Sequence, residues 1–86
     1  MDYLNARVER AFQTRTSAIG PEVEQHWEYW VRELETERKV TLIDPTKRDA
    51  PFASEGDVIM DVPVQWEEKD LAVLLNDNFI VDKNKS

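Results

Sequence analysis

Few side chains in this sequence could perform nucleophilic catalysis. His26 is the only histidine and there is no cysteine, so a serine nucleophile would have to combine His26 with Ser17 or Ser54. Neither serine lies in the sharp strand-to-helix turn that exposes a catalytic serine. Gly20 and Gly56, the only glycines, are too far apart to form a phosphate-binding loop. The sequence therefore predicts a protein that is not an enzyme.

Acidic side chains are numerous, but their spacing does not predict a metal site. Glu22 and His26 are four residues apart and would supply two ligands at most, and neither a zinc nor an EF-hand spacing is present. Glu67, Glu68 and Asp70 are typical of the first turn of a helix, where the macrodipole favours negative charge. We therefore expect no metal and no cofactor.

Residues 26–30, His-Trp-Glu-Tyr-Trp, form the most informative stretch of the chain. In a helix of ~3.6 residues per turn, Trp27 and Trp30 fall on the apolar stripe and Tyr29 lies well off it. This places the two tryptophans in the core, so Trp30→Ala should destabilise the fold, and it leaves Tyr29 on the surface. An exposed tyrosine beside charged side chains is typical of a contact surface. The predicted partner-binding residues are Tyr29, Glu28, Arg32, Glu33 and Glu35.

Arg15 lies in the apolar stripe of the first predicted helix, between Phe12 and Ile19. Its aliphatic stem could lie along the core while the guanidinium reaches water. Alternatively, Arg15 forms a buried ion pair or an interface contact. The sequence leaves both interpretations open.

The elements that would position these residues begin with two amphipathic segments, which predict a helical hairpin over residues 2–39. Apolar residues recur at helical spacing in 2–19 and again in 21–39, and acid-before-base pairs four residues apart support the second helix. Gly20 can end the first helix, and Pro21 suits the first position of the next. Such a short connection favours two antiparallel neighbours.

Residues 40–66 predict a strand, a long loop and a second strand. A β-branched run covers 40–43, the loop covers 44–57, and the residues of 58–66 alternate between apolar and polar. Pro63 cannot donate a backbone hydrogen bond, so the second strand should lie at a sheet edge or have interrupted pairing there.

Residues 67–82 allow two interpretations. The favoured one is a short third helix over 67–76 followed by a terminal strand at 79–81. The alternative is a β-hairpin in which a strand over 71–75 pairs with the strand over 79–81. With the helix, the single domain of residues 1–86 is α+β. It has an N-terminal antiparallel helical hairpin packed on a small, mostly antiparallel β-sheet and a short third helix near the C-terminus.

The charge balance bears on the class of partner. Eighteen acidic against eleven basic residues give a net charge of −7, which repels phosphate backbones and favours a basic protein surface. We therefore expect no direct binding of nucleic acid. No apolar run is long enough for a membrane span, so neither membrane insertion nor secretion is expected and the default location is cytoplasmic.

The sequence thus predicts a small acidic, non-enzymatic protein-binding module, an inhibitor or regulator that docks on a basic surface of a larger protein. In size and charge it is similar to bacteriophage accessory and anti-defence proteins, which is an analogy and not a motif match. One alternative is a homo-oligomeric or viral structural assembly subunit. A weaker alternative is an oligomer that binds a small nucleotide through its rings and its basic residues Arg7, Arg10, Arg15, Lys47 and Arg48.

Overall fold

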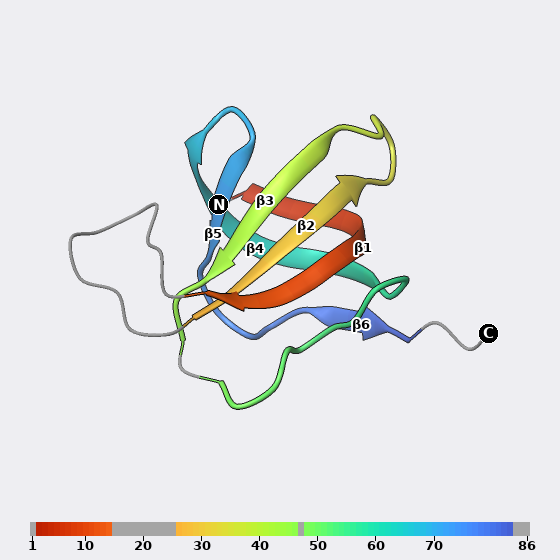
Figure 1. Ribbon diagram of the computed structural model, residues 1–86. Coiled ribbons are helices and arrows are strands. Elements are labelled where there is room, and N and C mark those ends of the chain that lie inside the picture. Colours follow the sequence, from red (N-terminus) through yellow and green to blue (C-terminus); the bar gives the residue numbers. More distant parts are fainter. Residues whose placement is uncertain (1, 15–25, 47, 84–86) are drawn as a thin grey trace.

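The described part of the chain is a single β-sheet of six strands (Figure 1). The computed structural model describes residues 2–14, 26–46 and 48–83. The strands are β1 (Asp2–Thr14), β2 (His26–Glu33), β3 (Lys39–Asp44), β4 (Val58–Glu68), β5 (Leu71–Leu74) and β6 (Ile80–Asp82).

The predicted α+β class is wrong, and so is the description of the protein as a small α+β domain. No helix occurs in the described ranges. Most of the segment expected to form the helical hairpin, residues 2–39, forms β1 and β2. The range of the expected third helix, 67–76, contains the end of β4 and all of β5. The described part of the chain is an all-β barrel of five strands with one additional strand.

The barrel has the strand order β1-β2-β3-β5-β4 and is closed by pairing between β1 and β4. β3 and β5 are parallel, whereas the other neighbours are antiparallel. Because β4 returns beside β1 after the β1-β2-β3 meander, the connection is a Greek key. β6 lies outside the closed ring and pairs with the first residues of β4. Closure leaves the five barrel strands few unpaired backbone groups.

The helix prediction for β1 and β2 failed because some apolar residues fit both the helical and the strand periodicity. Residues i and i+4 lie on the same face of a helix and also on the same face of a strand. Leu4 and Val8 therefore fit both patterns, and only Ala6 between them distinguishes the strand. All three are buried, as are Tyr29 and Val31 on β2. Aromatic and β-branched residues also favour the pleated surface of a strand.

A bulge lets the long strand β1 contribute to both sides of the barrel. Residues 2–7 pair with β4 and residues 6–14 pair with β2, and the β2 register shifts between Val8 and Arg10. Bulges bend a strand and increase its twist. Arg10 and Phe12 therefore share the outer face of the barrel with Trp30, opposite the buried Val8.

The strands predicted at 40–43 and 58–66 are confirmed as β3 and β4, and the long loop lies between them. The alternation predicted for β4 fails at its start, because a bulge at Asp61 (φ 57°) reverses it, so that Ile59 is buried and Met60 is exposed. The Asp61 N–H donates to Asn5 Oδ1 at 2.9 Å. The edge position suggested by Pro63 is wrong, since β4 lies between β1 and β5.

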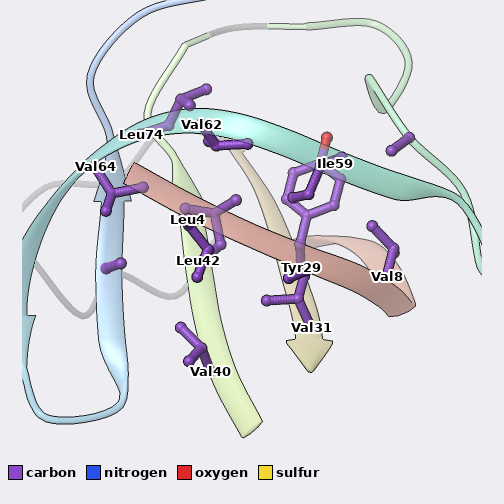
Figure 2. Close-up of a cluster of buried hydrophobic side chains, with 13 residues drawn as sticks. Leu4, Val8, Tyr29, Val31, Val40, Leu42, Ile59, Val62, Val64 and Leu74 are labelled. Carbon is purple, nitrogen blue, oxygen red and sulfur yellow. The ribbon is translucent and has the colours of Figure 1, made fainter. Parts of the chain in front are cut away.

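The C-terminal region follows the strand alternative, with different partners from those predicted. β5 pairs with β3 and β4, and β6 pairs with β4, so the two strands do not form a hairpin with each other. The core fills the barrel interior. Figure 2 shows its side chains converging from all five barrel strands, among them Leu4, Tyr29, Leu42, Val62 and Leu74.

Candidate functional site

Side chains alternate between the two faces of β2, and this assigns the aromatic residues of 26–30 to the interior and the surface in the opposite way to the sequence prediction. Tyr29 has no exposed surface and is the largest fully buried side chain among the described residues, whereas 44% of Trp30 is exposed. Trp27 is half-buried against the core. The expectations of a surface Tyr29 and a core Trp30 are therefore wrong, because these side chains project from opposite faces of a strand.

Tyr29 is held on both its ring and its hydroxyl group. Its ring stacks on Phe52, with centroids 4.1 Å apart, and Phe52 in turn meets Phe79 edge-on at 4.9 Å. The Phe52 N–H donates to the Tyr29 hydroxyl oxygen at 3.0 Å. Burial raises the pKa of Tyr29 to about 12. These contacts give Tyr29 a structural role and leave it no surface for a partner.

An ion-pair network fixes the start of the loop after β3. The Asp44 carboxylate is fully buried and accepts hydrogen bonds from Thr46 and Arg48, and Arg48 also donates to Asp77. The Arg48 guanidinium lies 5.4 Å from the Phe52 ring centroid, and the Arg48 carbonyl accepts from Trp27 Nε1 at 2.9 Å. With both carboxylates of the network occupied, we interpret it as structural.

The outer face of β1 and β2 carries an aromatic and cationic cluster that we call the Trp30 platform, formed by Arg10, Phe12, Glu28 and Trp30. Phe12 and Trp30 meet edge-on at 5.2 Å, and the Arg10 guanidinium lies 5.0 Å and 5.3 Å from their centroids. Trp30 Nε1 donates to Glu28 Oε2 at 2.9 Å. The indole is thereby oriented while much of its surface remains exposed.

A row of basic side chains lies beside the platform on the same face. In the register, Arg7 is opposite Arg32, and Arg32 is opposite Lys39. Arg32 is tied to Glu9 by an Nε–Oε2 distance of 3.1 Å. A hollow of about 280 Å³ adjoins Trp30, and it is lined by Glu9, Trp30, Val31, Lys39, Val40, Thr41 and Asp70.

A second, larger hollow of about 660 Å³ lies where the start of β1, the end of β2 and the end of β4 meet. We call it the acidic hollow, and its lining residues are Asp2, Tyr3, Glu33, Arg38, Trp66, Glu67, Glu68 and Lys69. Arg38 binds Glu33 at 2.8 Å and lies 5.0 Å from the Trp66 centroid. Tyr3 is 59% exposed. Carboxylates outnumber bases there by four to two.

The predicted partner-binding residues are therefore distributed over different regions. Glu28 belongs to the Trp30 platform and Arg32 to the adjacent basic row, whereas Glu33 lines the acidic hollow. Glu35 is exposed in the turn between β2 and β3. The prediction that Arg15 forms an interface or a buried ion pair falls on a residue outside the described ranges.

The surface aromatic residues that the structure brings forward, Tyr3 and Phe12, were not among the predicted site residues. Alternation along β1 was the available signal, because Tyr3 is out of phase with the buried series that begins at Leu4 and Ala6. The bulge before Arg10 then places Phe12 on the outer face. No periodicity of the sequence alone reveals such a bulge.

The described residues form neither a metal-binding cluster nor a membrane-spanning helix. They contain no group of three or more histidine, cysteine, aspartate or glutamate side chains placed to hold a metal ion. Over the same ranges no helix has the length and apolarity needed to cross a membrane. Comparison with protein-family models, curated proteins and solved structures finds no match for this chain.

Proposed function

We propose that the protein is a non-enzymatic protein-binding module whose acidic hollow docks on a basic surface of a larger protein, as an inhibitor or regulator. The observation that carries this proposal is the exposed Tyr3 ring beside an excess of carboxylates. A partner lysine or arginine can pair with Glu67 or Glu68 and lie against the face of Tyr3. Arg38 already covers Trp66 in this manner within the molecule.

The net charge of −7 supports the same proposal at longer range. A negative field accelerates encounters with a positive surface and disfavours acidic competitors, while it contributes less to final affinity. Affinity would come from the tyrosine, which buries much area at little entropic cost. The proposal includes a cytoplasmic location. A chain without cysteine needs no disulfide bonds, so it can fold in a reducing compartment.

Affinity capture from a host lysate, read by mass spectrometry, tests the proposal. The wild-type protein should enrich a protein with a basic surface, and the double variant Glu67→Lys/Glu68→Lys should lose it. The matched control is Asp49→Lys/Glu55→Lys, which changes the charge equally at two exposed loop positions outside the hollow. Capture that survives in the hollow variant, or that is lost equally in both variants, would contradict the proposal.

Self-association is a second candidate, favoured by one observation. Met60 and Ile80 are paired across β4 and β6 and are 37% and 55% exposed, and within the described ranges β6 pairs only with β4. A short strand with one free edge can pair with another chain. Light scattering over a dilution series should show dimers that Ile80→Lys abolishes. A monomer at every concentration would exclude this candidate.

A further inference from the structure

The Trp30 platform is surrounded by polar and charged side chains, and packing of the fold does not require them there. In the strand register Trp30 lies between Arg10 on β1 and Thr41 on β3. Arg10 covers the indole from the β1 side, whereas the 280 Å³ hollow begins at Trp30 and continues over Thr41 and Lys39 on the β3 side. The ring therefore forms one wall of an open, shallow site.

The charge of this face differs in sign from that of the molecule. Its basic residues are Arg7, Arg10, Arg32 and Lys39, and its acidic ones are Glu9, Glu28 and Asp70. The local balance is thus 4 − 3 = +1 in a chain of net charge −7. Two of the acids already have partners, since Glu9 accepts from Arg32 and Glu28 accepts from Trp30. This face therefore carries a small positive excess beside an exposed indole, in contrast to the rest of the molecule.

Three of these cations have no carboxylate partner among the described residues. In the described part of the chain neither Arg7 nor Lys39 forms an ion pair, and Arg10 contacts only the rings beneath it. Trp30 and the basic row at Arg32 are two residues apart on β2, which corresponds to ~7 Å along a strand. Lys39 lies opposite Arg32 and is therefore at a similar distance from Trp30 along the strands.

We propose that this face binds a single-stranded nucleic acid, with one base stacked on Trp30 in the hollow and the adjoining phosphates held by Arg7, Arg10 and Lys39. The edge of the base lies within reach of the Thr41 hydroxyl and the Asp70 carboxylate, which supply a donor and acceptors. Stacking on an exposed indole tolerates any base, since every base has a π-face. This function is additional to the protein-binding role of the acidic hollow and uses a different face of the barrel.

The proposal departs from the expectation of no nucleic-acid binding, which rested on the net charge of the whole chain and not on the charge of this face. Because the net charge is −7, non-specific contact with phosphates is disfavoured, and stacking must carry most of the affinity. About three phosphate contacts in a single strand correspond to a salt slope of roughly −2, since each contributes about −0.7. We therefore expect the binding constant to depend only modestly on salt concentration and strongly on the presence of the Trp30 ring.

Fluorescence anisotropy with a labelled oligonucleotide tests the proposal. Deoxythymidine and deoxyadenosine strands of about ten nucleotides fall within the usual site sizes of ~4–16, and the salt is varied between about 50 and 200 mM. Trp30→Ala should weaken binding at least about fivefold, as loss of a stacking ring does. Lys39→Ala should lower the salt slope by about one phosphate contact, and Trp30→Phe should retain most of the binding.

Controls separate this face from the rest of the molecule. Tyr3→Ala removes another exposed ring and should leave the binding of the strand unchanged. Circular dichroism and thermal melting verify that Trp30→Ala remains folded. A duplex of the same sequence should compete poorly, because its bases are already stacked on one another.

Three results would overturn the proposal. The first is that the wild-type protein does not bind the strand at the lower salt concentration, and the second is equal binding by Trp30→Ala and wild type. The third is that a mononucleotide competes as well as the strand, because it would show a free-nucleotide site in place of a single-strand surface. Loss of a captured protein on Trp30→Ala, with no binding of the oligonucleotide, would assign this face to a protein partner.

Discussion

The two faces of β2 carry similar side chains with opposite roles. On the inner face, Tyr29 is enclosed by a stacked ring and a backbone hydrogen bond. On the outer face, the next residue, Trp30, has an edge-on ring and a hydrogen bond to Glu28, and it keeps 44% of its surface exposed. Both rings are amphipathic anchors by type, so the face of the strand, and not the residue type, separates the structural ring from the one available for binding.

The comparison extends to the neighbours of each ring. The inner ring lies near a buried carboxylate that is neutralised by Arg48, so its polar surroundings are complete. The outer ring lies beside cations that, within the described ranges, have no anionic partner, namely Arg7, Arg10 and Lys39. A complete set of contacts indicates a role in stability, whereas charged groups without partners beside an exposed ring indicate a role in recognition.

Truncation of the inner ring should have the largest effect. Tyr29→Ala should lower the free energy of unfolding by about 3–5 kcal/mol, because it leaves a cavity among packed side chains. Urea denaturation followed by circular dichroism measures the change. A loss below about 1 kcal/mol would mean that Tyr29 is not the centre of the core and that the contrast between the two faces fails.

Loss of the cation near the inner ring should cost nearly as much. Arg48→Met leaves the buried Asp44 carboxylate without its counter-charge, and removing one partner of a buried pair typically costs about 3–5 kcal/mol. The matched control is Asp77→Asn, because Asp77 is exposed and such pairs contribute about 0–1 kcal/mol. Chemical denaturation of both variants tests this, and equal losses would show that the network acts as a surface feature.

The stability of the inner face should also depend on pH in a defined direction. The pKa of Tyr29 is raised from 10.0 to about 12 by burial, so between these values the unfolded phenol loses its proton while the folded one keeps it. Stability is therefore complete below pH 10 and falls as the pH rises, by about 2–3 kcal/mol over the two units. Tyr29→Phe should remove this part of the pH dependence. An identical pH profile in both proteins would contradict the burial of the hydroxyl group.

The smallest effect on stability is expected on the outer face. Trp30→Ala should cost less than about 1 kcal/mol, since a partly exposed ring creates no internal cavity when it is removed. The same thermal and urea measurements apply, with Tyr29→Ala as the reference. A loss as large as that of Tyr29→Ala would show that the platform supports the fold, and it would weaken the argument that this ring serves a ligand.

The sequence by itself determined the local features of this protein. The β-branched run of β3, the strand character of β4 and the loop between them were predictable because strand-forming side chains and turn residues act within a few positions. Net charge and the lack of cysteine follow from composition alone. The same local patterns gave the wrong element for β1, β2 and β5, because residues four apart, such as Leu4 and Val8, share a face in both a helix and a strand. In β2 the error also exchanged the faces of Tyr29 and Trp30.

Only the tertiary structure decided the rest. Pairing of β1 with β4 joins residues some sixty positions apart and brings Tyr3 and Glu67 to one hollow. The bulge in β1 turns Phe12 outward toward Trp30. Whether a ring is buried depends on which strands pack against it, and long-range pairing across the barrel determines those strands. The sequence of residues 26–30 alone therefore does not show which of its side chains face the interior.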